Sequence, residues 1–389
     1  MSDARFRYHV FDLVTLRTVD EVPFDTLHWT RVLDRPGGWT ASIDARNEKA
    51  TGSTLEPGRV GVAVELGGLV LFAGPIWPRS GKVDGVESNL DLGGQGILSC
   101  WRGPATDYGR HLLGRDGMTH ATGAADDVIT WTDVDYFHIV ADLFAHAASF
   151  AGTTPLTIEN RGTGPGGLCG ATTSRTFYVS ERKNIGDLLE ELAAEEPGFD
   201  FGVDWHFSTD VSGRSTVVPV LTLENTRGTI TDITLHEKVD VAVLEHALDG
   251  VSANVLLLQG QGAGADALTT EVTAAASIAP VGVFPRLERR VTARDAKTVE
   301  ELVSLGAGMI GRAGRPLFTA TLDVIDAQLE LVATLREGDV VYLEAHDGAI
   351  DVDDYLRVIT IDGTIDVDSN FALKLGCASL DHYPEIVAP

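Results

Sequence analysis

The sequence predicts a mainly β protein with α+β parts, organised as two β-barrel domains and two smaller α/β domains. Three observations lead to this fold class. The chain has 389 residues, roughly two to four times the usual length of one domain, so several hydrophobic cores are expected. Short runs rich in Val, Leu and Phe, bounded by turn residues, occur in two separate regions. Helical periodicity occurs in three stretches between those regions.

The first β region is predicted from residues 61–77, GVAVELGGLVLFAGPIW. The run reads as two strands joined by Gly67 and Gly68, the dipeptide that a tight type I′ hairpin turn favours. A turn at residues 56–60 precedes it, and VESNLDLGGQG supplies a further alternating strand. We predict a first barrel over residues 1–105, with residues at about 215–240 as its candidate completion.

The second β region repeats this order near the C-terminus. A turn at residues 337–340 opens VVYLEA, a turn at Asp347 and Gly348 follows, and then come YLRVITID and NFALKLGC. The matching order of turns and strands favours two related barrels within one chain. The second barrel is assigned to residues 241–265 together with 316–389.

The three helical stretches define the remaining domains. Phe137, Val140, Leu143 and Phe144 recur at helical spacing within residues 135–150, which predicts a packing face. Residues 199–224 read as a strand pair around a polar turn. These features predict an α+β domain over residues 106–214, whose second helix is described next.

That second helix is NIGDLLEELAAEEPGF, with Asn184 as its N-cap and a stop at Pro197 and Gly198. The third follows the strand-like LERRVTA and opens with a capping box from Thr298 to Glu301. It predicts a small α/β insert over residues 266–315.

The composition is that of a folded soluble protein, with 44% hydrophobic and 22% charged residues. The opening MSDARFRYHV lacks the features of a secretory signal, and no run approaches ~18 apolar residues. We expect synthesis in a cytosol and no stable membrane insertion. The chain has three cysteines, Cys100, Cys169 and Cys377. Because they form no CxxC pair, they suggest neither disulfides nor a zinc site, and each is expected to be a buried apolar residue.

The charge balance is strongly acidic, with 30 Lys and Arg against 57 Asp and Glu and a net charge of -27. Binding of duplex DNA requires Lys and Arg to neutralise phosphates, so a DNA-binding surface is not expected. An acidic wall suits a conduit through which DNA passes without sticking. Solubility alone is the alternative explanation.

A search for chemical motifs predicts no catalytic, cofactor-binding or metal-ligating residue and no cofactor. HEKVD places Asp240 where a zinc-protease helix that begins at His236 needs its second histidine. There is no GxxxxGK[ST] phosphate loop and no GxSxG elbow. Two glycine clusters are interpreted as loops, because neither has the spacing and following helix of a dinucleotide site: Gly260, Gly262 and Gly264, and residues 162–167.

The acidic clusters of the C-terminal region are interpreted as solvent faces of strands. An EF-hand loop that began at Asp366 would need glycine where Phe371 stands. Carboxylate pairs for glycoside hydrolysis are too numerous in so acidic a chain to single out. The acidic clusters of the C-terminal region are Asp351, Asp353 and Asp354, and Asp366 and Asp368.

Residues 11–44 and 56–77 resemble the opening of minor tail proteins, the tail-tip (baseplate) hub proteins of actinobacterial siphophages. The resemblance lies in a Trp-containing strand at residues 27–29, a Gly-rich turn at 36–38, and a hairpin that ends in residues 74–77. It extends more loosely to SANVLLLQGQGAGAD, RLERRV, LREGDVVYLE and YLRVITID.

The resemblance implies a phage tail hub-like fold with two β-barrels per subunit, and a homotrimeric ring around a passage for DNA ejection. It implies a virion component at the tail tip, synthesised in the bacterial host cytoplasm and without enzymatic activity. The implied partners are the distal tail protein ring, tail fibre or tip proteins, and the tape measure protein. The chain ends at HYPEIVAP without an appended hydrolase, so wall cleavage is not expected.

Two alternative functions remain open at this point. One is a tail-associated cell-wall or glycan hydrolase that uses a pair of the many carboxylates. The other is a host receptor-binding module, in which Trp131, Tyr136 or Trp205 would stack on sugars, although packing in a core is the favoured interpretation of these aromatic residues.

Overall fold

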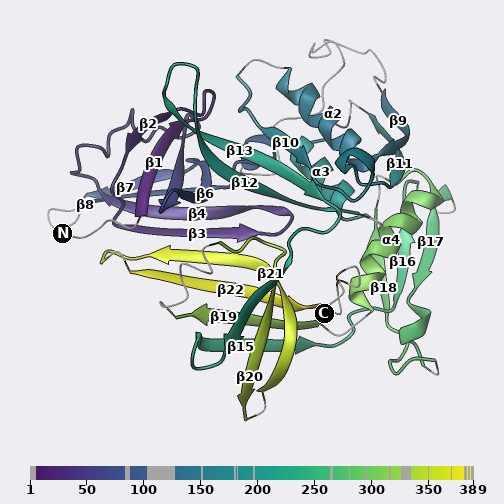
Figure 1. Cartoon of the computed structure of the whole chain (residues 1–389). Coiled ribbons are helices and arrows are strands. Elements are labelled where there is room, and N and C mark those ends of the chain that lie inside the picture. The colour runs from purple at the N-terminus through teal and green to yellow at the C-terminus, as the bar shows by residue number, and fades with distance from the viewer. Residues whose placement is uncertain are drawn as a thin grey trace.

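The structure is a computed structural model, and Figure 1 shows the whole chain. It describes residues 6–83, 88–102, 128–149, 152–178, 181, 183–195, 198–262, 266–279, 281–293, 296–314, 317–325, 334–348, 350–368, 370–380, 383 and 386. Within those ranges, no helix is both long and apolar enough to span a membrane.

A large mixed sheet runs through the molecule and connects its N-terminal and C-terminal halves. Eight of its strands follow one path, β15-β19-β22-β21-β3-β4-β8-β7, while β20 branches from β21 and carries β14. Figure 1 shows β3 and β4 beside β21 and β22. The ten strands described are β3 (Thr26–Val32), β4 (Arg35–Asp44), β7 (Arg79–Val83), β8 (Ser88–Gln95), β14 (Ile230–His236), β15 (Val241–Asp249), β19 (Leu317–Val324), β20 (Val340–Asp347), β21 (Ile350–Ile365) and β22 (Phe371–Ser379).

The N-terminal β region consists of two packed sheets, the β3, β4, β8 and β7 part of the large sheet and a smaller sheet in the order β2-β1-β5-β6. The Trp29 ring stacks on the Phe72 ring with centroids 6.3 Å apart. At one edge Trp77 N donates to Gly93 O at 2.9 Å. A Cβ at Gly94 would lie 2.0 Å from a carbonyl oxygen of the smaller sheet, so only glycine permits this approach. The smaller sheet contains β1 (Phe6–Asp12), β2 (Thr18–Glu21), β5 (Val60–Leu66) and β6 (Leu69–Pro75).

The C-terminal β region is a series of six strands, β14-β20-β21-β22-β19-β15. Its first and last strands are joined by a short turn in which Lys238 N donates to Val241 O at 3.0 Å. The 16-residue strand β21 belongs to both β regions, because its first half pairs with β20 and residues 360–365 pair with β3. A register shift after Val358 in its pairing with β22 marks the change of partner.

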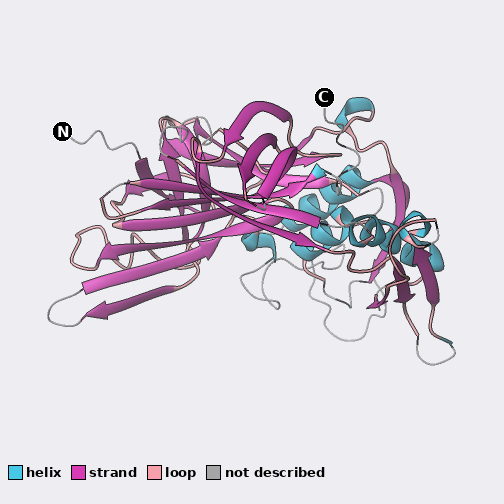
Figure 2. Cartoon of the chain, turned by 90° about the horizontal axis from the view of Figure 1, so that it is seen from below, coloured by secondary structure: helices cyan, strands magenta, loops and turns pink. Residues whose placement is uncertain are grey.

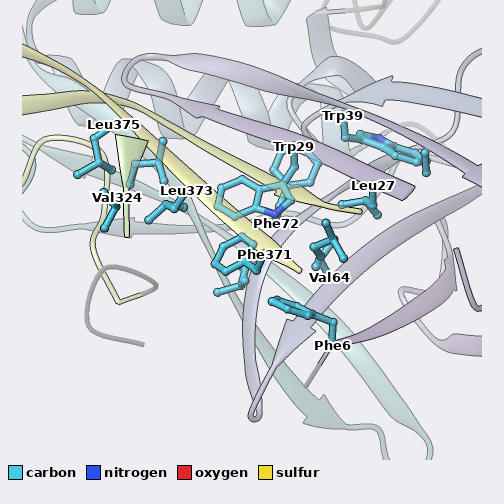
Figure 3. Packing of buried hydrophobic residues seen from close by; sticks show 14 of the residues in the cluster. Phe6, Leu27, Trp29, Trp39, Val64, Phe72, Val324, Phe371, Leu373 and Leu375 are labelled. Atoms are coloured by element: carbon cyan, nitrogen blue, oxygen red, sulfur yellow. The ribbon is translucent and has the colours of Figure 1, made fainter. Parts of the chain in front are cut away.

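One continuous hydrophobic core joins the two β regions. Figure 3 shows Trp29 and Phe72 close to Phe371, which the C-terminal strand β22 contributes. Phe371 also meets Phe6 edge to face at 5.1 Å. The N-terminal and C-terminal halves therefore share their apolar contacts and do not form two separate cores.

The helices gather at one end of the molecule, away from the N-terminus (Figure 2). In the α+β region they pack on strands through a second core that includes Phe137, Leu143, Leu188 and Phe201. Asp135 caps the helix Tyr136–Ala148 and Asn184 caps the helix Ile185–Ala193, each accepting from an amide two residues later. The elements are α1 (Ser99–Arg102), β9 (Val128–Asp135), α2 (Tyr136–Ala148), β10 (Thr157–Asn160), η1 (Pro165–Gly167), β11 (Thr172–Tyr178), α3 (Ile185–Ala193), β12 (Asp200–Thr209) and β13 (Ser215–Glu224).

A separate three-stranded sheet with one helix interrupts the hairpin between β15 and β19. Asp249 is paired with Leu317, so the chain leaves the large sheet and returns to it at adjacent positions. The interrupting segment has the sheet order β17-β16-β18. Its elements are β16 (Val255–Gln259), β17 (Thr269–Thr273), η4 (Ala275–Ser277), β18 (Glu288–Thr292) and α4 (Val299–Ala313).

Two fully buried arginines lie where β12 and β13 meet the C-terminal β region. Arg227 Nη1 donates to Glu224 Oε1 at 3.0 Å and Arg227 Nη2 to Asp204 Oδ1 at 2.6 Å. Arg357 donates to Asp200 and, at 2.9 Å, to the Arg227 carbonyl oxygen. Burial alone would raise the pKa of Asp204, but the charge and hydrogen bond of Arg227 hold it below its ordinary value.

The mainly β class with smaller α/β parts is confirmed. The hairpin predicted within residues 61–77 is present as β5 and β6, and Gly67 and Gly68 have φ of 59° and 93°, as a type I′ turn requires. The strand pair predicted within residues 199–224 is present as β12 and β13. The capping box at Thr298 is formed with both of its hydrogen bonds.

Two strands lie outside the domains to which the sequence analysis assigned them. β14, within the proposed completion of the first barrel at about 215–240, pairs in parallel with β20 of the C-terminal region. β16, within the segment 241–265 assigned to the second barrel, pairs with β17 and β18 of the insert. β14 alternates polar and apolar residues and takes a partner far along the chain, whereas β16 is an apolar run that pairs with the nearby β17. The local pattern of each indicates a strand but not which sheet it joins.

Some predicted features lie outside the described residues. The start of the predicted domain 106–214 is among them, because residues 103–127 are not described. The others are the first two residues of VESNLDLGGQG, Pro197, Gly264, and most of HYPEIVAP.

Candidate functional site: the polar face of the large sheet

The large sheet has one apolar face and one polar face. Along β19, β22, β21, β3, β4 and β8, buried residues alternate with exposed or half-buried ones, because successive side chains of a strand point to opposite sides. The buried set, such as Trp29, Ile361 and Leu375, faces the shared core. The opposite set, which we call the polar face, is Thr26, His28, Thr30, Thr40, Ser42, Asp44, Ser80, Lys82, Asn89, Asp91, Val243, Glu245, Ala247, Thr319, Thr321, Asp323, Thr360, Asp362, Thr364, Ala372, Lys374 and Gly376.

The strand register makes the polar face continuous across both β regions. Asp323, Lys374, Asp362 and Thr30 are successive cross-strand neighbours on β19, β22, β21 and β3. Lys374 Nζ lies 3.1 Å from Asp323 Oδ1, and the Thr30 hydroxyl donates to Asp362. Direct contacts between side chains thus cross the junction between the N-terminal and C-terminal halves.

Small hydroxyl side chains and carboxylates dominate this surface. Five carboxylates stand on it against the ammonium groups of Lys82 and Lys374, and the carboxylates are Asp44, Asp91, Glu245, Asp323 and Asp362. The hydrogen bond to Asp323, followed by the charges of Asp323, Glu245 and Asp362, raises the pKa of Lys374. The polar face is therefore acidic, and most of its side chains are short.

The two ends of the strand path are edge strands. Among the described residues β15 pairs only with β19 and β7 only with β8. β15 is nine residues long, and Val243 and Leu248 on it are 47% and 70% exposed. A long edge strand with exposed apolar side chains and no Lys or Pro is unprotected against pairing with another chain.

The failed metalloprotease motif lies in a turn and not on a helix. His236 and Asp240 lie at the two ends of the link between β14 and β15, where the Asp240 carboxylate accepts from His236 N at 3.0 Å. The His236 ring is 3.0 Å from Glu344 instead. In the described part of the chain, no group of three His, Cys, Asp or Glu side chains is arranged to hold a metal ion.

The acidic clusters lie on exposed strand and turn positions. Asp351, Asp353 and Asp354 are exposed on β21. Asp366 caps the β21–β22 turn by accepting from the Asp368 and Asn370 amides, and the side-chain and backbone hydrogen bonds of Asn370 lower its pKa.

Two of the three aromatic residues considered for sugar stacking are buried. Trp131 and Tyr136 lie in the α+β core, whereas Trp205 is half-buried and meets the buried Phe11 ring edge to face at 6.3 Å. Gly260 and Gly262 follow β16, as the loop interpretation expected. Cys169 and Cys377 are buried, Cys100 is half-buried, and none of the three is in a disulfide.

No family model and no curated protein matches the chain, whereas solved structures do. The 43 kDa tail protein of prophage MuSo2 from Shewanella oneidensis is similar with a TM-score of 0.61 at 12% identity, over 97% of this chain and 99% of that one. A tail protein from Neisseria meningitidis MC58 gives 0.57 at 11% identity, over 96% of each chain. Prophage tail protein gp18 from Listeria monocytogenes EGD-e gives 0.51 at 11%, over 96% and 94%. The chain therefore has the fold of phage tail proteins over nearly its whole length.

Proposed function

We propose that the chain is a structural hub of a phage tail tip. It forms a homotrimeric ring that joins the distal tail protein ring to tail fibre or tip proteins, with the tape measure protein as a further partner. DNA leaves through the ring during ejection. The fold shared with phage tail proteins supports the tail assignment. The protein acts through the geometry of its assembly and carries no chemical step.

The polar face is the observation that carries this proposal. It covers eight strands without interruption, its side chains are short, and its carboxylates outnumber its ammonium groups. A wall of this kind repels phosphates and offers no Lys or Arg stripe along which DNA would bind. It suits the inner surface of a passage.

The edge strands explain how copies would join. All seven neighbouring pairs along the eight-stranded path are antiparallel. Because eight is even, β15 of one copy would run antiparallel to β7 of the next copy, and the sheet would continue without a break. Such head-to-tail contacts close into a ring when the rotation allows it. Three copies of eight strands would give a continuous wall of 24.

Sedimentation velocity and negative-stain electron microscopy of the purified chain test this proposal. We expect a trimer with threefold symmetry and an open centre. Adding edge-protecting lysines in Val243→Lys/Leu248→Lys should shift the chain to monomer, since charged side chains discourage edge pairing. The control Val211→Lys changes a fully exposed valine on the β12–β13 turn, away from the edge strands, and should leave the trimer intact. A double variant that stays trimeric contradicts the proposed joint, and a wild-type chain that stays monomeric within assembled tails contradicts the ring.

A further inference from the structure

The segment between β15 and β19, residues 251–314, is attached to the large sheet at one place. We call it the insert. The outgoing and returning chains lie side by side there, with Ser252 N and Ala253 N both donating to Ala313 O, at 3.1 and 3.3 Å. Gly250 in this neck has open space around its Cα. A lobe carried on two adjacent chain segments can turn as one body.

The insert is internally rigid. Leu256, Leu258, Leu302 and Ile310 form a core of its own between α4 and its sheet. A Cβ at Gly306 would lie 2.6 Å from Val272 Cγ2, so the helix lies directly on the strands. Its sheet shares no strand pairing with the large sheet among the described residues.

A cavity separates the insert from the polar face. It has a volume of about 650 Å³. Thr319, Thr321 and Gly376 of the large sheet line one side, and Met309 and Ala313 of α4 line the other. The insert thus covers one end of the polar face without packing tightly on it.

The insert meets the α+β region where a Cβ at Gly308 of α4 would lie 2.9 Å from Ala194 O, and Lys297 makes a polar contact between the two. Its ammonium lies 3.6 Å from the centroid of the Tyr178 ring and 3.3 Å from Glu181 Oε1. It also donates to Thr176 O at 3.5 Å. The Lys297 side chain is only 20% exposed, which strengthens both the ion pair and the cation–π contact. A second cavity of about 460 Å³ flanks these residues.

We propose that the insert is a hinged lid over the polar face, held closed by Lys297. When the Lys297 contacts break, the insert turns at its neck and uncovers the strand ends beneath it. The hinge depends only on the contacts above. Its role as a gate at a passage rests on the proposed function.

An introduced thiol, Ala378→Cys, and the natural Cys169 serve as reporters for a test on the purified, full-length chain. Ala378 is 5% exposed, lines the cavity beneath the insert and is the cross-strand neighbour of Thr319 on the polar face. Cys377 does not serve, because its side chain lies in the shared core on the other side of the sheet. Cys169 is 4% exposed in the α+β core and reports general unfolding. Alkylation by iodoacetamide, with the modified peptides followed by mass spectrometry, measures the opening at each site separately.

In the Ala378→Cys background, Lys297→Met should speed alkylation of the introduced thiol on the order of tenfold, corresponding to about 1.4 kcal/mol, and leave alkylation of Cys169 unchanged. Lys297→Arg, which keeps the charge over the ring, should behave as the wild type. The control Arg286→Ala removes ion pairs that lie wholly within the insert and should change neither rate. Unchanged alkylation of the introduced thiol in Lys297→Met overturns the hinge, as does a parallel rise at the introduced thiol and at Cys169. Because this readout needs no ring, it is independent of the trimer measurement.

Discussion

Replacing Arg357 by methionine tests how the two halves of the molecule are held together. The side chain is fully buried, and it donates to the Asp200 carboxylate, the Arg227 carbonyl oxygen and the Gly338 carbonyl oxygen. Methionine fills a similar volume but removes the positive charge that pairs with the Asp200 carboxylate, whose side chain is 11% exposed. The Arg227 amide then remains as a donor to Asp200, at 2.8 Å. Removing one partner of a buried ion pair typically costs about 3–5 kcal/mol, which is the loss expected here.

Native-state hydrogen exchange of peptides from β13 and β21 measures this loss locally, which matters because a chain with several cores need not unfold in one step. The matched control is Arg46→Met. It breaks the ion pair with Asp44, and the Arg46 side chain is 70% exposed. We expect no measurable change in protection there, because an ion pair in solvent contributes little to stability. In Arg357→Met with Asp200→Asn, the loss should be smaller than in Arg357→Met alone, because no unpaired charge remains. A loss for Arg357→Met that matches the control would refute the reasoning.

Three further predictions concern packing, pH and helix capping. Gly363→Ala places a Cβ about 2.3 Å from the Trp29 ring and should cost about 1–3 kcal/mol by overpacking; unchanged urea unfolding would contradict this. The hydrogen bond from Asp351 raises the pKa of His346 above 6.5, so its contribution to stability is full below that value and is lost as pH rises through the raised pKa. The pKa of His346, measured by NMR titration, should fall toward 6.5 in Asp351→Asn. Thr298→Ala removes the N-cap of α4 and should lower the protection of that helix against hydrogen exchange by about 1 kcal/mol; equal protection would count against it.

Much of the local structure could be predicted from the sequence, because its signals lie within a few residues. The Gly67-Gly68 dipeptide specifies the β5–β6 turn through the positive φ angles it permits. The Thr298 capping box and the Asn184 cap mark the starts of α4 and α3, where unpaired amides need side-chain acceptors.

The polar face was missed, although a signal for it exists. The patterns Thr-x-Ser-x-Asp at 40–44, Thr-x-Thr-x-Asp at 319–323 and Thr-x-Asp-x-Thr at 360–364 all predict strands with one small polar side. That these strands form one sheet could not be predicted, since the partners are far apart in the chain. The buried Arg227 and Arg357 also carry no local mark, because arginine is ordinarily a surface residue.

The pairing of β3 with β21 has a consequence for how the chain folds during synthesis. Thr30 and Asp362, which meet across this pair, are 332 residues apart. At about 5–20 residues per second, a ribosome needs roughly 20–60 s to make the chain between them. Throughout that interval β3 lacks its β21 partner, although β4 and the strands of the smaller sheet are synthesised early in it. Contacts this distant in sequence form slowly, so the nascent N-terminal half must tolerate an open strand edge until nearly the last strand emerges.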